Sequence, residues 1–322
     1  MDPETGRLDL RGDFTAPGKP YPLALDPHRR YLHVGCPGVN EISSFRIDQS
    51  TGRSSLIGTV TLESAPCYLA TDRTGRYMLS AYYYPGKVIV HAIGEDGAVA
   101  GPPVEWADTA PGAHSVQTDP SNRFVYVPSV AGSNGGNLIF QFKFDGGTGR
   151  LTPNLPSSIT PKEEAGPRHF RFHPNMYVVY FSNEQGCSVT AYNLDPSAGT
   201  LAAFQTVSTL PYGYVGENFC SQIQVSSSGR FLYALNRGHN SIACFSIDAA
   251  NGLLTPTQRM PTQPVPRSFG LDPEGKFLYA AGEESGRLAS YFVDAASGML
   301  EPLDIYDVGE APVWVLIARL RA

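Results

Sequence analysis

Four residues whose side chains can transfer protons or hold anions are the first features of this sequence that suggest chemistry. They are His114, Glu184, Arg168 and Arg267. A histidine and a carboxylate can exchange protons near neutral pH, and guanidiniums bind carboxylates, phosphates or oxyanions through paired hydrogen bonds. The four side chains could therefore activate a water molecule and hold an anionic substrate, if the fold brings them together. The competing interpretation is that they pair with one another and join neighbouring elements.

A pattern that recurs along the chain determines where these residues stand. Each copy has an alternating apolar run, a turn that often resembles Asp-Pro-x-Gly-Arg, and a tyrosine-rich apolar run. The anchor residues of the turns lie about 46 to 54 positions apart and are Asp26, Asp72, Asp119, His173, Ser226 and Asp272. A period of about 40 to 50 residues with short alternating strands is typical of the blades of a β-propeller.

The last full copy shows the content of one predicted blade. Glycine-containing turns join its four expected strands, 268–271, 277–281, 288–293 and 300–308. We predict an all-β chain, a seven-bladed β-propeller of four-stranded antiparallel blades that forms a single domain over residues 1–322. Six copies are visible, and the head (2–14) and tail (311–317) together would make an incomplete terminal blade. A β-sandwich is the alternative, but it does not require a regular repeat.

Propeller geometry would bring residues of different blades to one channel mouth. The first strand of a blade lines the channel and the second runs antiparallel to it, so the start of the first and the end of the second share one mouth. Five positions before the anchors stand Tyr21, Cys67, His114, Arg168, Ser221 and Arg267. Eleven positions after the anchors stand Pro37, Tyr83, Val130, Glu184, Arg237 and Glu283. His114, Arg168, Glu184 and Arg267 are thus expected in one ring at this mouth. Arg237 and Glu283 are expected in the same ring, and either of them could serve instead as an ion-pair partner that joins neighbouring blades.

The composition argues against several classes of protein. The chain has 322 residues, 42% of them hydrophobic and 17% charged, which indicates a large buried core. A net charge of −6 argues against nucleic acid as a partner, and no apolar run is long enough to cross a membrane. Five scattered cysteines favour neither a disulfide framework nor a zinc site, and the first residues show no signal region. We predict a cytoplasmic monomer or homodimer with no metal and no cofactor.

Short segments in a fixed order give the chain a resemblance to a known family. They are 112–115 (Gly-Ala-His-Ser), 166–169 (Gly-Pro-Arg-His), 182–184 (Ser-Asn-Glu), 235–239 (Leu-Asn-Arg-Gly-His), 266–269 (Pro-Arg-Ser-Phe) and the tail 308–315. In these segments the sequence resembles the lactonase family of seven-bladed propellers, which includes bacterial 6-phosphogluconolactonase and fungal carboxymuconate lactonizing enzyme. The resemblance covers about residues 8 to 320. It implies an active site that contains His114, Arg168, Glu184 and Arg267.

Several positions depart from the family pattern and bear on the substrate. Tyr68 stands where family members commonly carry a histidine, and Tyr82-Tyr83 replaces a common Asn-Tyr pair. Gln222 and Ser129 take the place of frequent acidic residues. The pocket is therefore expected to be more aromatic and less acidic than in sugar-lactone members, which suits a flatter or more apolar lactone. The residues predicted to bind substrate are Tyr68, Tyr83, Arg237, His239 and Glu283.

Three functions follow as hypotheses. The first is a lactonase of carbohydrate metabolism that hydrolyses a small sugar-derived or more apolar lactone. Glu184 or His114 would be the general base, the other would assist proton transfer, and Arg168 and Arg267 would hold the substrate anion or the oxyanion. The second is a cycloisomerase of the carboxymuconate lactonizing type, which closes a lactone with the same residues. The third is a propeller that binds a partner without catalysis, because fold alone does not determine function.

Overall fold

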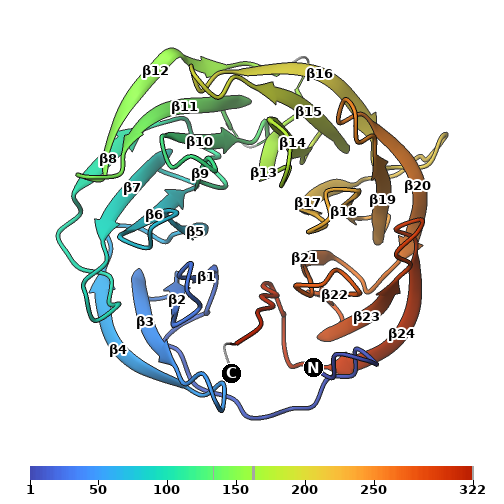
Figure 1. Ribbon diagram of the computed structural model, residues 1–322, viewed down its shortest axis with the longest axis horizontal. Coiled ribbons are helices and arrows are strands. Elements are labelled where there is room, and N and C mark those ends of the chain that lie inside the picture. Colours follow the sequence, from blue (N-terminus) through green and yellow to red (C-terminus); the bar gives the residue numbers. More distant parts are fainter. Residues whose placement is uncertain (133, 162–163, 321–322) are drawn as a thin grey trace. The chain divides into compact units, whose positions relative to one another are not determined.

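The computed structural model describes residues 1–132, 134–161 and 164–320, and all regular secondary structure in this part of the chain is β. Six sheets are formed there, and each contains four antiparallel strands in sequence order (Figure 1). This meander is the structure of a propeller blade. The same residues contain no helix that could span a membrane. The chain divides into two compact units with three sheets each, which we call the early and the late unit.

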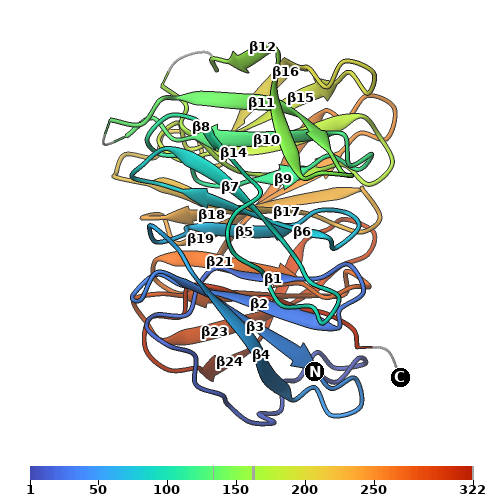
Figure 2. The ribbon, with the colours of Figure 1, turned by 90° about the vertical axis from the view of Figure 1, so that its left-hand side faces the viewer.

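The early unit comprises Gly12–Lys162, Pro196–Thr200 and Arg319–Ala322. Its first sheet contains β1 (Leu23–Leu25), β2 (Tyr31–Cys36), β3 (Glu41–Ile47) and β4 (Ser54–Thr61). Its second sheet contains β5 (Tyr68–Thr71), β6 (Tyr77–Tyr82), β7 (Lys87–Ala92) and β8 (Glu105–Asp108). Its third sheet contains β9 (Gln117–Thr118), β10 (Phe124–Ser129), β11 (Leu138–Asp145) and β12 (Arg150–Ile159). Figure 2 turns the ribbon so that this unit faces the viewer.

The late unit comprises Met1–Arg11, Glu163–Asp195 and Leu201–Ala318. Its first sheet contains β13 (Pro167–Phe172), β14 (Val178–Asn183), β15 (Ser188–Leu194) and β16 (Leu201–Ser208). Its second sheet contains β17 (Phe219–Val225), β18 (Phe231–Arg237), β19 (Ser241–Ile247) and β20 (Leu254–Pro261). Its third sheet contains β21 (Pro266–Leu271), β22 (Phe277–Gly282), β23 (Arg287–Val293) and β24 (Leu300–Asp307).

The anchor residue of the repeat builds the turn between the first two strands of a blade. Asp72 accepts hydrogen bonds through Oδ1 from the backbone N–H groups of Arg76 (2.8 Å) and Tyr77 (3.0 Å). Gly75 lies in this turn with φ +73°, a conformation that glycine adopts without strain. The carboxylate therefore replaces the partners that these N–H groups lack in the turn, which explains why an aspartate recurs in the pattern.

The recurring apolar runs form the core between neighbouring sheets. In the late unit, Tyr233 and Leu235 of β18 are buried in one cluster with Phe269 of β21 and Leu278 of β22. Successive side chains of a strand point to opposite faces, so each central strand can pack on both neighbours. Burial of such side chains contributes roughly 1.5–3 kcal/mol each. The regular period of the sequence thus corresponds to sheets that pack face to face within the unit.

A tyrosine of the second strand joins each sheet of the late unit to the next one along the chain. The Tyr180 hydroxyl donates to the carbonyl oxygen of Gly252 (2.8 Å), which lies in the turn between β19 and β20. The Tyr233 hydroxyl donates in the same way to Gly298 (2.9 Å), between β23 and β24. Each bond pairs a buried hydroxyl with a turn carbonyl, and this accounts for the tyrosine in the repeat.

The head of the chain supplies the corresponding turn for the last sheet. The Tyr279 hydroxyl donates to the carbonyl oxygen of Gly6 (2.6 Å). Gly6 N donates to Asp2 O (2.9 Å), just as Gly252 N donates to Asp248 O (2.8 Å). The head therefore repeats the turn that precedes the outer strand of a complete blade.

The tail lies against the first strand of the same sheet. Val315 N donates to Ser268 Oγ (2.7 Å), and Val315 and Ile317 pack on Phe277 and Tyr279. Neither the head nor the tail forms a strand within the described residues, so the terminal blade is incomplete there, as predicted. The predicted four-stranded antiparallel blades are confirmed, and the strands expected for the last copy agree with β21–β24 to within two residues. The single domain over residues 1–322 stays a prediction.

Candidate active site

Arg168 and Arg267 stand at irregularities in the first strands of their blades. In the pairing of β13 with β14 the register shifts between Pro167, opposite Asn183, and His169, opposite Ser182, so Arg168 stands at a β-bulge. The pairing of β21 with β22 shows the same shift at Arg267. β-bulges of this kind change the direction of a side chain and are frequent beside active sites.

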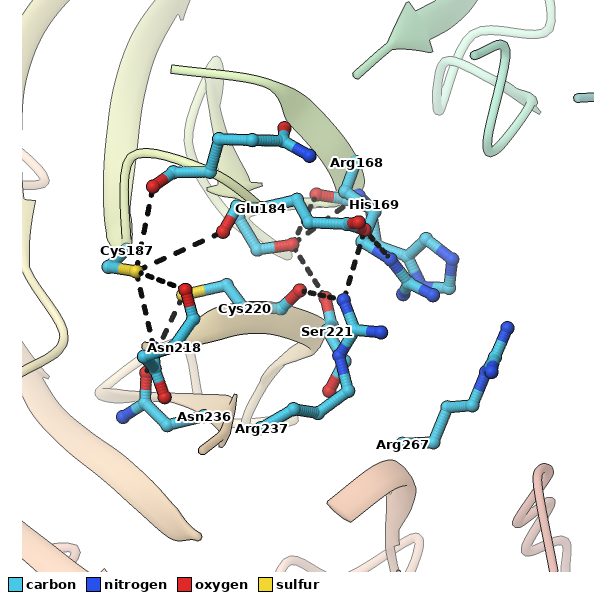
Figure 3. A network of polar contacts seen from close by, with 12 residues as sticks. Arg168, His169, Glu184, Cys187, Asn218, Cys220, Ser221, Asn236, Arg237 and Arg267 are labelled. Carbon is cyan, nitrogen blue, oxygen red and sulfur yellow. Dashed lines mark hydrogen bonds and ion pairs between the residues drawn. The ribbon is translucent and has the colours of Figure 1, made fainter. Parts of the chain in front are cut away.

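A carboxylate between two guanidiniums forms the centre of the candidate site (Figure 3). Glu184 Oε2 lies 2.5 Å from Arg168 Nε and 3.2 Å from Arg237 Nη2. The exposed fractions of the side chains are only 3% for Arg168, 15% for Glu184 and 17% for Arg237. The pair between Glu184 and Arg237 joins the first and second sheets of the late unit, so the pairing of charges between blades that the sequence left open is present here.

Contacts with the backbone hold Glu184 and Arg237, the less buried members of this cluster, in place. Glu184 follows the last residue of β14, and its N–H donates to Gly166 O (2.7 Å) while its carbonyl accepts from Cys220 N (3.0 Å). Arg237 ends β18, donates through Nη2 to Cys220 O (3.1 Å) and lies with its guanidinium 5.9 Å from the centre of the Phe219 ring. The cluster is therefore fixed by strand ends rather than by loops.

Arg267 and Glu283 form a second, more open ion pair at 3.2 Å between Nη1 and Oε2. Their side chains are 32% and 30% exposed. Figure 3 shows Arg267 on the side of the cluster where the guanidinium of Arg168 lies. Burial lowers the pKa of Arg168, the positive charges of Arg237 and Arg267 lower it further, and Glu184 raises it. The three guanidiniums thus act on one another electrostatically, and their ion pairs involve Glu184 and Glu283. Positive charge gathered in this way suits an added anion.

His239 lies on the connection from β18 to β19, two residues after Arg237. Its Nδ1 is 2.7 Å from Ser241 Oγ, and its backbone N–H donates to Asn218 Oδ1 (3.0 Å). Its ring packs against Tyr214 with ring centres 4.9 Å apart. The bond to Ser241 and the contact with Tyr214 therefore hold the imidazole, while the bond to Asn218 fixes the backbone of His239.

Some residues of this region were missed in the sequence. Asn218 bonds Asn236 Oδ1 (3.1 Å) as well as His239, but it stands in a loop outside the repeat and carried no signal. His169 is 2% exposed, and its ring centre lies 6.3 Å from that of Trp314. Its place directly after Arg168 is the signal that could have identified it.

His114, Tyr68 and Tyr83 belong to the early unit. His114 is 8% exposed, donates through its backbone N–H to Pro128 O (2.9 Å), and packs edge-on against Tyr83 with ring centres 5.7 Å apart. Tyr68 begins β5, is buried, and accepts a hydrogen bond from Gln117 Nε2 (3.2 Å) through its hydroxyl. His114 and Tyr83 are thus in contact with each other, whereas the Tyr68 hydroxyl contacts Gln117 of β9.

The structure thus brings together Arg168, Glu184 and Arg237, and it pairs Arg267 with Glu283. His239 stands two residues after Arg237 on the connection to β19, and His114 packs against Tyr83 in the early unit. The catalytic and binding roles of these residues stay predictions. In residues 1–132, 134–161 and 164–320, no group of three or more His, Cys, Asp or Glu side chains is placed to hold a metal ion.

Comparisons with known sequences give one consistent result. Residues 1–317 match the family model described as "Lactonase, 7-bladed beta-propeller". A 6-phosphogluconolactonase of Pectobacterium carotovorum subsp. carotovorum is 35% identical over 315 residues, which cover 98% of this chain and 93% of that protein. A 6-phosphogluconolactonase of Serratia proteamaculans is 33% identical over 314 residues, with the same shares covered.

Solved structures give a similar result. The periplasmic gluconolactonase PpgL of Pseudomonas aeruginosa superposes with a TM-score of 0.82 at 27% identity, over 89% of this chain and 85% of that one. A putative 6-phosphogluconolactonase from Bacteroides fragilis superposes with a TM-score of 0.81 at 25% identity, over 91% of this chain and 85% of that one.

Proposed function

Since the chain belongs to the family of seven-bladed β-propeller lactonases, we propose that it hydrolyses a small lactone that carries an anionic group. Membership confirms both the resemblance and the propeller class predicted from the sequence, and it assigns the protein to a family of enzymes. The observation that carries the proposal is the cluster in which Arg168 and Arg237 hold Glu184, together with Arg267, whose charge acts on Arg168 and which pairs with Glu283.

The proposed reaction adds water across the ring ester. The water oxygen forms a bond to the carbonyl carbon, and the bond from that carbon to the ring oxygen breaks. A proton leaves the water to a general base and another reaches the departing alkoxide, so the product is an open hydroxy acid. We assign the proton transfer to Glu184 or His114, each with the other assisting, because carboxylates and imidazoles are suited to it.

The arginines differ in accessibility and therefore in proposed role. Arg168 is almost fully buried against Glu184, so it positions that carboxylate and adds positive charge where the oxyanion develops. Arg267 is one-third exposed, and its partner Glu283 is exposed to a similar degree. A phosphate or carboxylate of the substrate can therefore displace Glu283 and form the paired hydrogen bonds that guanidiniums offer.

The substrate class is proposed from two sources. The relatives named 6-phosphogluconolactonase support a phosphorylated sugar lactone, and the excess of guanidiniums fits a phosphate. In the early unit, Tyr68 stands in place of the histidine and Tyr82 in place of the asparagine expected of the family, and these exchanges beside Tyr83 support a flatter lactone. Lactones of both classes would carry an anionic group that binds Arg267. They differ in the part that would contact the tyrosines, which is a sugar ring in the first class and a flatter ring in the second.

Cyclisation of a carboxymuconate is the other reaction that the sequence suggested, and guanidiniums also suit its carboxylates. The two reactions are separated by their direction. Hydrolysis releases a proton at pH 7 when a lactone is added, whereas cyclisation removes the ultraviolet absorption of a muconate without consuming water. We expect proton release with at least one lactone and no loss of muconate absorption. Loss of muconate absorption with no proton release from any lactone would reverse the assignment.

The cellular location and the assembly state also remain proposals. We propose a cytoplasmic monomer or homodimer that acts on a small molecule rather than on nucleic acid or a membrane, and that needs no cofactor. Fractionation of the source cells tests the cytoplasmic location, and the mass of the protein in solution tests the assembly state. Full activity after dialysis against a chelator tests the last.

A further inference from the structure

A cavity of about 240 Å³ opens in the early unit between the end of β4 and the face of β7 and β8, and none of the candidate active-site residues described above lines it. Lys87, Ile89 and His91 alternate along β7, so their side chains share one face, and Trp106 of β8 is the partner of Ile89 in the strand register. Glu63, which follows the end of β4, also lines the cavity. Figure 2 shows this unit facing the viewer.

His91 is the most unusual residue of this cavity. It is 3% exposed, and within the part of the chain that the structure describes its Nδ1 is buried without a hydrogen-bond partner. Burial lowers the pKa of His91, so the imidazole is neutral near pH 7 and offers one donor and one acceptor. Buried polar atoms in native proteins are nearly always paired, so a group that bonds His91 is expected to enter the cavity.

The remaining walls indicate what kind of group this is. Trp106 is 60% exposed and supplies an aromatic face, while Ile89 forms an apolar part of the wall. Lys87 carries a positive charge, and its Nζ lies 4.0 Å from Oδ1 of the negatively charged Asp108. Glu63 adds a second negative charge in the wall of the cavity. An anion would meet these carboxylates and a cation would meet Lys87. Hydroxyl groups suit this mixture best, because each both donates and accepts hydrogen bonds.

We propose that this cavity is a second binding site for a neutral sugar ring of monosaccharide size. The apolar face of the ring packs on Trp106, and its hydroxyls bond Lys87, Glu63 and His91. Aromatic side chains with a few polar groups around them are typical of small-molecule sites. The proposal does not depend on the lactonase activity, because none of these residues belongs to the candidate active site.

Ligand-detected NMR by saturation transfer tests the proposal with defined probes. Glucose, galactose, mannose and N-acetylglucosamine serve as neutral sugars, with gluconate and glucosamine as charged analogues. We expect at least one neutral sugar to bind the full-length protein more tightly than either charged analogue. Trp106→Ala should weaken binding about tenfold or more while lactone turnover stays unchanged, since truncation of an aromatic contact residue has effects of this size. Tyr177→Ala, which removes a 67% exposed aromatic residue elsewhere, is the matched control and should bind normally.

Two further variants distinguish this site from the active site. Glu184→Gln should leave sugar binding intact, and His91→Phe should abolish it if the variant folds. Trp106 is mostly exposed, so its substitution keeps the test decisive when His91→Phe does not fold. The proposal is wrong if no neutral sugar binds at 50 mM, a concentration about 50 times a millimolar Kd. It is also wrong if binding survives Trp106→Ala or disappears in Glu184→Gln.

Discussion

At the scale of single residues, burial separates the arginines that organise the site from the arginine that can exchange partners. Arg168 is held by Glu184 at 2.5 Å and is 3% exposed, so removing either partner leaves a buried charge without compensation. Arg267 is 32% exposed and can lose Glu283 to a ligand at little cost. Substitution of these two arginines should therefore have different consequences.

Arg267→Ala should raise the KM of an anionic lactone by about 10- to 100-fold, the size expected for lost hydrogen bonds to a charged group. An uncharged lactone should be affected much less, and Arg267→Lys should restore part of the affinity. Steady-state kinetics on a charged and an uncharged lactone measures the difference. Arg287→Ala is the control, because Arg287 forms an exposed ion pair with Asp307 in the same blade. Equal losses on both lactones would refute the role of Arg267 in anion binding.

His33 makes a prediction about acid stability. It is fully buried with Nδ1 3.1 Å from Ser44 Oγ, and burial lowers its pKa from 6.5 to about 4. The unfolded chain therefore binds a proton that the folded protein does not, and stability falls as the pH drops from about 6.5 towards 4. This loss amounts to about 3 kcal/mol at 1.36 kcal/mol per pH unit.

Replacement of His33 by a residue that does not titrate should reduce this sensitivity. Urea unfolding of His33→Gln at pH 7 and pH 4.5 should show a smaller difference in the free energy of unfolding than the unchanged protein. His28→Gln is the control, because His28 is exposed in the same unit. An identical pH dependence in His33→Gln and the unchanged protein would contradict the assignment.

At the scale of elements, the repeated tyrosine explains how an incomplete blade is accommodated. Tyr180 and Tyr233 each bond a turn glycine of the following sheet, and Tyr279 bonds Gly6 of the head. The head thus supplies the same tyrosine-to-glycine contact as a blade turn, although it forms no strand in the described residues. The tail adds a hydrogen bond from Val315 N to Ser268 Oγ in β21, the first strand of the same sheet.

Tyr279→Phe should therefore destabilise the protein by about 1 kcal/mol, the typical contribution of one hydrogen bond, plus part of the penalty for an unpaired carbonyl. Tyr233→Phe should have a similar effect, because it removes the same contact between complete blades. Tyr177→Phe, at a largely exposed position, should have almost none. The shift in the thermal midpoint measures all three. A Tyr279→Phe variant as stable as Tyr177→Phe would show that the head does not act as a blade turn.

At the scale of the whole molecule, the features that repeat were predictable and those that break the repeat were not. The turn aspartates, the strand tyrosines and the four-strand period each recur, so their physical cause could be inferred from spacing alone. The same spacing placed Arg168, Glu184, Arg237 and Arg267 at the ends of strands. The bulges at Arg168 and Arg267 could not be predicted, because a register shift depends on pairing across strands.

The cavity lined by His91 could not be predicted from the sequence either. An isolated histidine in an apolar strand most often serves as a core residue, and only the arrangement of β4, β7 and β8 shows that its ring borders an open space. Asn218 was missed for the related reason that it stands in a loop between periodic segments. Sequence reasoning therefore recovered the framework and the charged cluster, and it failed where contacts depend on irregular backbone.

The central claim is that the Glu184 cluster opens a lactone. Its most direct test is proton release at pH 7 by the protein and by Glu184→Gln, over phosphosugar, plain sugar, muconolactone-type and aromatic lactones. We predict rapid proton release with an anionic lactone and a loss of about 10²- to 10⁴-fold in Glu184→Gln, the usual effect of removing a proton-transfer group. Circular dichroism should show that the variant is folded. Undiminished turnover by folded Glu184→Gln, or no proton release from any lactone, would contradict the account.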